Sequence, residues 1–227
     1  MNKSIDIILI ICVIFFITTV ELIPQQFNQL ADAAIEKDTL KINQLLQTGI
    51  NINSQHKTTG TTVLMIASSY YYYDGIVQYL IKKGANVNLQ DNEGKTALLW
   101  AASNSLPNSK ILVANGADVN IAANDGMTPF LQATLGVSSG KVTIEMCDLL
   151  RKKGANINAA LTKKSAMGWT ALHYAAINGD VDLVKYLIKY GANVNETTGE
   201  GSTPLYLAQL GNHEEIVKLL KSAGAKN

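Results

Sequence analysis

The sequence predicts an all-α fold: a solenoid of stacked helix-turn-helix units with projecting hairpin loops. Three observations predict it. One phrase, Gly-Ala-Asn-Val-Asn or a close variant, begins at Gly49, Gly84, Gly116, Gly154 and Gly191, and a further copy starts at Gly224. A second phrase, Gly-x-Thr followed by apolar residues, precedes the later copies. The copies lie 32 to 38 residues apart, and a period of about 20 to 50 residues is typical of stacked repeats.

The composition excludes several classes of protein. Of the 227 residues, 47% are hydrophobic and 16% are charged, which argues against an intrinsically disordered chain. The net charge of +1 offers no basic excess for nucleic acid. Two cysteines cannot build a disulfide framework, and three histidines leave little for metals. We therefore expect no cofactor, no metal and no nucleic-acid partner.

Residues 1–23 form a hydrophobic segment that predicts a signal sequence or a membrane anchor. The 14 uncharged residues 7–20 lie between Asp6 and Glu21. As a helix they would span about 21 Å, short of a hydrocarbon core of about 30 Å, which suits a secretory signal with Lys3 before it. If Asp6 and Glu21 snorkel, residues 5–23 could instead cross the membrane uncleaved.

Whether the leader is cleaved stays open. Residues 17–19 make a poor cleavage site, and the better Ala31-Asp32-Ala33 lies inside a predicted helix. Because Lys3 is the only positive charge before Lys37, we expect the N-terminus to stay inside. The repeats would then be exported, or anchored outside the cytoplasm by a single pass.

The copy from Gly168 to Asn195 shows why each unit should contain two helices. Small and apolar residues in 171–176 predict a short helix that a neighbour can approach closely. Asn178-Gly179-Asp180 is typical of a turn. The second helix has one apolar face, formed by Leu183, Val184, Leu187 and Ile188. Gly191 then stands where a helix C-terminus favours a left-handed residue.

These phrases closely resemble the ankyrin repeat, whose period is 33 residues and whose signature is T-P-L-H-x-A. In this sequence the clearest match is Thr170-Ala171-Leu172-His173-Tyr174-Ala175. The resemblance begins after a linker at 24–26 and covers residues 27–227. It divides them into six repeats at about 27–57, 58–90, 91–122, 123–160, 161–197 and 198–227.

Departures from the period are expected between helices, where loops tolerate insertion. The fourth repeat carries five extra residues in the region 136–140, and the loop from Asn158 to Gly168 is four residues longer than its counterpart. The first repeat lacks the Gly-x-Thr entry. The last helix carries Glu214, Glu215, Lys218 and Lys221, the polar outer face that a terminal repeat needs.

The resemblance implies structural roles for the conspicuous polar residues. His173 and Thr170 are expected to hydrogen-bond and hold the start of the helix. Cys147 is expected to be a small buried hydrophobe. No catalytic or phosphate-binding motif appears, so we do not expect an enzyme. Asn195-Glu196-Thr197 is a glycosylation sequon, meaningful only in a chain exported by a glycosylating cell.

Aromatic residues supply the first candidate contacts with a partner. Tyr70, Tyr71, Tyr72 and Tyr73 fall at the turn between two helices and cannot all be buried. Either they contact a partner, or one or two rings cover the end of the stack. Trp100 shares the helix position of Tyr174 and is expected to pack. Trp169, beside a hairpin tip, is expected to be exposed and to contact a partner.

The resemblance implies a non-catalytic scaffold that binds another protein through a concave surface. The family's variable positions map to hairpin tips and inner helices. The candidates are Asn92, Glu93, Lys95, Ser103, Asn104, Asn124, Asp125, Met127, Ala166, Met167, Trp169, Ile177, Asn178, Glu200 and Ser202. The alternative is an inhibitor or accessory subunit of one enzyme or toxin in the exported compartment. Any membrane contact is expected only through residues 5–23.

Overall fold

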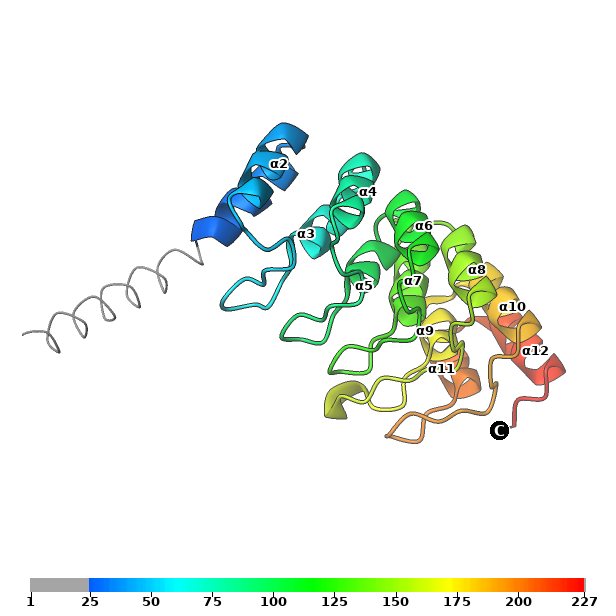
Figure 1. The fold of residues 1–227 in the computed structure, drawn as a ribbon. Helices are drawn as coiled ribbons and strands as arrows, with labels where there is room; N and C mark the ends of the chain where they lie inside the picture. Colours follow the sequence, from blue (N-terminus) through cyan, green and yellow to red (C-terminus); the bar gives the residue numbers. More distant parts are fainter. Residues whose placement is uncertain (1–24, 227) are drawn as a thin grey trace, which may run out of the picture.

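The computed structural model describes residues 25–226, and the predicted leader at 1–23 lies outside them. Within this part of the chain the fold is the predicted all-α solenoid, built from successive helix pairs (Figure 1). The described helices are residues 25–35, α2 (Thr39–Gln47), α3 (Val63–Ser69), α4 (Asp74–Lys82), α5 (Ala97–Ala102), α6 (Leu106–Ala114), α7 (Pro129–Ser138), α8 (Ile144–Lys152), the 3-10 helix η1 (Lys164–Ala166), α9 (Ala171–Asn178), α10 (Val181–Lys189), α11 (Pro204–Leu210) and α12 (Glu214–Ser222).

The helices stack in two rows, and the connecting loops project from one edge (Figure 1). The inner row is α3, α5, α7, α9 and α11, and the outer row includes α4, α6, α8, α10 and α12. The projecting hairpin loops are residues 48–62, 83–96, 115–128, 153–170 and 190–203. Among residues 25–226, no helix has the length and apolar character needed to cross a membrane.

One continuous hydrophobic core runs through the stack because the same repeat positions are buried in every pair. Alanines on the inner helices let neighbouring helices approach closely. Their side chains are almost wholly inaccessible at Ala67, Ala101, Ala133, Ala175 and Ala208. Large side chains fill the position three residues earlier, at Leu64, Leu98, Phe130, Leu172 and Leu205. Each pair therefore buries its apolar face only against its neighbours.

A threonine begins each inner helix and accounts for the Gly-x-Thr phrase. Its hydroxyl accepts the amide of the third residue after it, which satisfies a free donor of the first turn. This bond measures 3.2 Å at Thr62, 3.3 Å at Thr96, 3.2 Å at Thr128 and 3.1 Å at Thr203.

His173 completes the same arrangement at the start of α9, which confirms the predicted bond. The Thr170 amide donates to Nδ1 of His173 at 3.2 Å, and the Thr170 hydroxyl lies 2.8 Å from the same atom. Nε2 then faces the carbonyls of Glu196 and Ser202, each at 3.2 Å. Burial lowers the pKa of His173 below its ordinary value of 6.5, against these carbonyl contacts, so the neutral ring is favoured.

The asparagine that ends the Gly-Ala-Asn-Val-Asn phrase links each helix pair to the next. Its Nδ2 donates to the carbonyl of the following phrase's glycine at 3.0–3.1 Å, and its Oδ1 accepts an amide two residues further on at 2.7–2.9 Å. We call these residues the asparagine ladder: Asn53, Asn88, Asn120, Asn158 and Asn195. The ladder explains why the phrase recurs.

The insertion in the fourth repeat lengthens a helix, and the prediction that it lies in a loop is wrong for residues 136–138. These residues belong to α7, which continues to Ser138. Gly136 permits this because a Cβ there would stand only 2.9 Å from Cα of Ser103 and 2.8 Å from Cγ2 of Val142. Because α7 packs this closely on the end of α5, residues 136–138 continue the helix instead of forming the loop that their composition suggests.

Candidate partner-binding site

Three hollows lie in succession on the face formed by the inner helices and the hairpin loops. The Trp100 hollow, of about 220 Å³, is lined by Lys95, Leu99, Trp100, Ser103, Asn104 and Gln132. The hairpin hollow, of about 390 Å³, is lined by Asn92, Glu93, Lys95, Asn124, Asp125 and Lys163. The Trp169 hollow, of about 480 Å³, is lined by Lys164, Ser165, Ala166, Met167, Trp169, Tyr174, Thr198, Gly199 and Glu200. Lys95 is shared by the first two, and the adjacent Lys163 and Lys164 connect the second to the third.

Most of the predicted surface residues line these hollows, but four do not. Met127, Ile177 and Ser202 are half-buried and Asn178 is exposed, all outside the three linings. Ser103 lines the Trp100 hollow but is only 8% exposed. Its hydroxyl accepts a hydrogen bond from Nε2 of Gln132 at 2.9 Å.

Asn92 and Asn124 use their side chains to fasten neighbouring hairpins together. Nδ2 of Asn92 donates to the carbonyl of Thr58 at 3.0 Å, and Nδ2 of Asn124 donates to the carbonyl of Asn92 at 3.0 Å. Gly94 has a φ of 78°, and a Cβ there would meet the Asn124 amide nitrogen at 2.9 Å. Glycine is thus required both for the left-handed turn and for the close approach. These bonds hold the hairpin hollow in shape.

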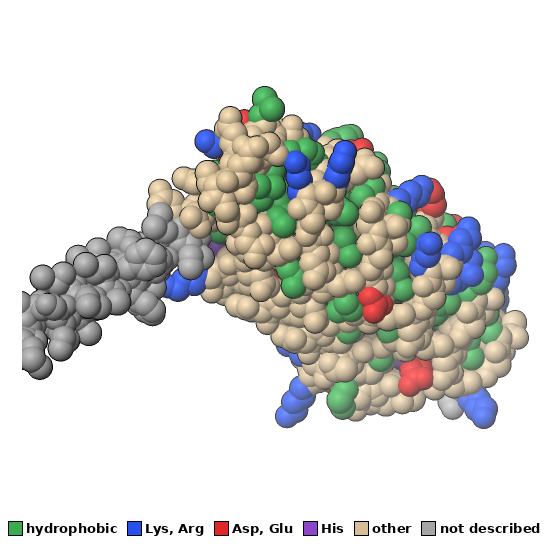
Figure 2. All heavy atoms as spheres, in the orientation of Figure 1, with side chains coloured by type: hydrophobic (Ala, Val, Ile, Leu, Met, Phe, Trp, Pro, Cys, Tyr) green, Lys and Arg blue, Asp and Glu red, His purple; other side chains and the backbone are tan. Residues whose placement is uncertain are grey.

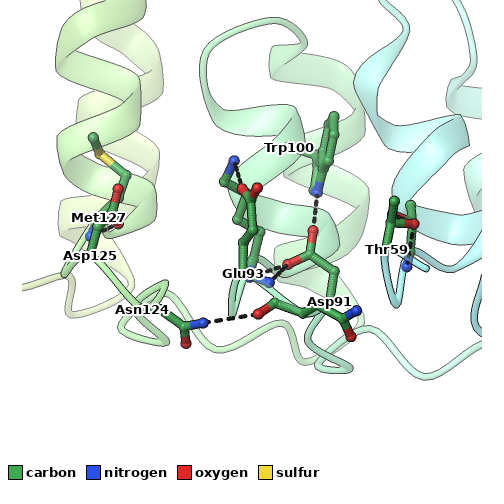
Figure 3. Close-up of polar contacts among 10 residues, drawn as sticks. Thr59, Asp91, Glu93, Trp100, Asn124, Asp125 and Met127 are labelled. Carbon is green, nitrogen blue, oxygen red and sulfur yellow. Dashed lines mark hydrogen bonds and ion pairs between the residues drawn. The ribbon is translucent and has the colours of Figure 1, made fainter.

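Asp91 organises the boundary between the first two hollows (Figure 3), and the sequence analysis did not identify it. Its carboxylate accepts the amides of Glu93 at 3.0 Å and Lys95 at 2.8 Å. The other carboxylate oxygen accepts Nε1 of Trp100 at 3.3 Å. Asp91 is only 9% exposed, so it shapes the hairpin and orients the indole. The sequence could have indicated Asp91 through its position three residues before the hairpin glycine Gly94, because aspartate is favoured in turns.

Trp100 packs against the core as predicted, and a lysine covers its ring. The side chain is half-buried against the hydrophobic cluster. The Lys95 ammonium lies 5.8 Å from the ring centroid and also pairs with the Glu93 carboxylate. Glu93, Lys95 and Trp100 therefore form one connected group of side chains.

Trp169 is half-buried, and the prediction that it is exposed is wrong. Its ring centroid lies 4.9 Å from that of Tyr174, with the planes tilted by 45°. The lengthened hairpin contains η1, whose residues line the Trp169 hollow together with Met167. Burial, with a smaller contribution from the charge of Asp125, raises the pKa of Tyr174 above 10.0.

The tyrosine run lies away from the three hollows, at the turn between α3 and α4. Tyr70, Tyr71 and Tyr72 are 43%, 51% and 76% exposed, whereas Tyr73 is half-buried. The Tyr73 hydroxyl donates to the carbonyl of Ile35 at 2.7 Å. The inner helix α3 runs from its hairpin to this turn, so its length separates the run from the hairpin edge. The role of the run in partner contact stays a prediction.

Cys147 is a buried thiol, as predicted. Its side chain is wholly inaccessible, and burial raises its pKa from 9.0 to about 12. The protonated thiol is neither a nucleophile nor a metal ligand at neutral pH. Among residues 25–226, no group of three or more His, Cys, Asp or Glu residues could hold a metal ion.

The outer helices carry the charged surface of the stack. Figure 2 shows lysine and arginine side chains gathered over the outer row. Within the described residues, two of them pair with acids on a neighbouring helix: Lys110 with Glu145 at 2.7 Å and Lys185 with Glu215 at 2.9 Å. Exposed pairs of this kind contribute little to stability. Two further hollows lie against α12, one of about 450 Å³ beside the end of α11 and one of about 330 Å³ beside α10. The hairpin face is distinguished from them by its succession of three hollows across several repeats.

The fold and the hollowed face define a helical repeat solenoid of the binding-module class. The family described as "Ankyrin repeats (3 copies)" matches residues 30–123 and 134–227. The chain therefore belongs to the ankyrin repeat family. Repeats of this family generally mediate protein–protein interaction and generally lack catalytic activity.

Curated relatives differ widely in length. The chain is 33% identical over 190 residues to the putative ankyrin repeat protein FPV031 of fowlpox virus (strain NVSL), covering 80% of this chain and 53% of that protein. It is 31% identical over 198 residues to the putative ankyrin repeat protein YahD of Escherichia coli (strain K12), covering 85% and 94%. It is 32% identical over 195 residues to mouse Rabankyrin-5, covering 82% and 16%. The chain thus spans about half of the first relative, nearly all of the second and a small part of the third.

Proposed function

We propose that this chain is a non-catalytic scaffold that binds a partner protein through the concave face containing the three hollows. The observation that carries the proposal is their succession along one face, linked through Lys95 and through the adjacent Lys163 and Lys164. An extended partner segment could occupy all three at once. Solenoids of this kind use such surfaces for binding.

The binding face is held in shape before any partner arrives. The asparagine ladder joins successive helix pairs, and the amides of Asn92 and Asn124 join successive hairpins. Asp91 fixes both a hairpin and the Trp100 indole. A preorganised surface binds with a smaller loss of conformational entropy than one that must first order itself.

We further propose that the leader exports the repeats or anchors them outside the cytoplasm. The support is the uncharged stretch at residues 7–20 with Lys3 before it. N-terminal sequencing of the mature protein distinguishes the two forms: a start near residues 20–34 means cleavage, and Met1 means an anchor.

Site-specific photocrosslinking in the source cells tests the binding face. A photoreactive residue placed at exposed Met167 or Glu93 should yield one shared partner adduct, and the same residue at Gln78 on the outer helix α4 should not. Adducts at Gln78 alone would place the interface on the convex face. If the partner is an enzyme whose activity falls on binding, the scaffold acts as an inhibitor.

A further inference from the structure

The Trp169 hollow contains an aromatic pair with no basic side chain over it. Trp169 and Tyr174 both line the hollow, and both are half-buried. Within residues 25–226, no lysine or arginine lies over either ring. Lys164 lines the same hollow, but its ammonium lies over neither ring.

Four of the five other half-buried tyrosine and tryptophan rings of the described chain are covered by its own cations. The pairs, with the distance from the charged group to the ring centroid, are Lys37 on Tyr73 at 4.4 Å, Lys83 on Tyr79 at 5.4 Å, Lys95 on Trp100 at 5.8 Å and Arg151 on Tyr190 at 3.9 Å. Tyr186 instead directs its hydroxyl to Asp148 at 3.3 Å. Among these half-buried rings, Trp169 and Tyr174 thus differ in lining a hollow with no cation over either ring.

The Trp100 hollow shows what is missing at the Trp169 hollow. In Gly94-Lys95-Thr96 the lysine covers Trp100 and pairs with Glu93. In the matching Gly168-Trp169-Thr170, tryptophan takes the place of that lysine, and Tyr174 takes the place of Trp100. The substitution removes the chain's own cation and adds a second aromatic ring.

The acidic component is nevertheless present at the Trp169 hollow. Glu200 lines the hollow, is exposed, and forms no ion pair within residues 25–226. Asp125 acts on Tyr174 from the adjoining hairpin through its charge. A cation placed on the rings would find a carboxylate beside it, as Lys95 finds Glu93.

We propose that the Trp169 hollow binds one basic side chain, arginine or lysine, of the partner protein, with the cation over Trp169 and Tyr174 and Glu200 as its countercharge. This inference rests on the proposed function and names the chemistry of the partner at one place on the binding face. A ring and a carboxylate together favour a cation over an aliphatic side chain of similar size.

Selection of random peptides displayed on phage against the full-length protein tests the proposal. Selected peptides should share one arginine or lysine. Replacing that residue with glutamine should weaken binding roughly five- to tenfold, which is the size of a partly desolvated cation–π contact with a charged partner. The variant Trp169→Lys should bind the parent peptide more weakly by a similar factor. Its lysine would place the chain's own cation in the hollow, as Lys95 does at Trp100.

Two further variants keep the result interpretable. Trp169→Phe retains a ring and should bind within about threefold of the wild type, whereas Glu200→Lys should bind as weakly as Trp169→Lys. Helical circular dichroism of each variant reports folding.

Four outcomes would overturn the inference. Selected peptides whose shared residue is aliphatic contradict it. Peptides that bind Trp169→Lys and the wild type with equal affinity also contradict it. Both outcomes leave binding at the concave face intact. Peptides that crosslink only to the convex position Gln78 contradict both the inference and the proposed function. Failure to recover any peptide with a shared basic residue also counts against the inference.

Discussion

The side chain of Asn158 donates from Nδ2 to the backbone carbonyl of Gly191 at 3.1 Å, across the junction between two helix pairs. Its Oδ1 accepts the amide of Asn193 at 2.9 Å, so one amide group bridges the junction twice. The same two bonds recur along the whole asparagine ladder.

Replacing Asn158 with alanine should lower the free energy of unfolding by about 1–2 kcal/mol, because two exposed hydrogen bonds between helix pairs are lost. Urea denaturation followed by helical circular dichroism measures the change. Asn158→Asp keeps the acceptor and loses the donor, so its effect should be intermediate. Asn115→Ala is the matched control, since Nδ2 of Asn115 bonds only within its own helix turn at Ile111. An equal loss in the control would show that the bridge contributes nothing particular.

Gly136 and Gly75 should respond in opposite directions to alanine. At Gly136 the new Cβ would stand 2.8 Å from Cγ2 of Val142 and 2.9 Å from Cα of Ser103, and overpacking of this kind costs about 1–3 kcal/mol. At Gly75, also helical, a Cβ meets nothing within 4 Å. There alanine should stabilise by up to about 1 kcal/mol. Thermal melting of both variants is sufficient, and stabilisation by Gly136→Ala would contradict the close packing of α7 on α5.

His173 should make stability depend on pH in the acidic range. Its pKa is lowered in the folded state, so the unfolded chain binds the proton first. The contribution of neutral His173 to the free energy of unfolding is therefore complete above the ordinary pKa of 6.5. It is lost as the pH falls from there toward the lowered folded-state pKa. His173→Leu places the residue found at Leu99 and Leu131 in this position. The difference in unfolding free energy between wild type and variant should shrink between pH 7 and pH 5, and a constant difference would refute the argument.

Asp91→Asn should disturb Trp100 more than the hairpin. One oxygen of the asparagine can still accept the amides of Glu93 and Lys95, but its amino group would face the indole N–H of Trp100. We expect a loss of about 1–2 kcal/mol in unfolding free energy and a shift of Trp100 emission, observed with Trp169→Phe as background. Asp91→Ala should cost more because all three donors lose their partner. An unchanged emission spectrum would exclude the orienting role.

The sequence predicted the stacking well because the same phrases recur and each recurrence carries one physical requirement. Threonines begin helices, glycines make left-handed turns, and alanines permit close packing, so local chemistry and global fold agree. The α7 extension was missed because residues 136–140 have the composition of a loop. Only the neighbouring Ser103 backbone explains why Gly136 remains helical.

The geometry of the proposed binding face was predicted less completely than the fold. Asn92 and Asn124 were identified as surface positions, but the structure shows their amides engaged with the next hairpin. Trp169 is half-buried because the lengthened hairpin and Tyr174 pack around it. The bonds of Asn92 and Asn124 join residues about one repeat apart, and a motif defined within one repeat carries no information about them.

The asparagine ladder also determines how the array should respond to force. Its bonds cross every junction along the described chain, so a pull between the two ends loads the junctions in series. Each junction relies on its own few bonds and its own packed surface, and failure at one need not break the next. Under tension the array should therefore unfold one helix pair at a time, and each pair should refold on its neighbour when the tension is removed.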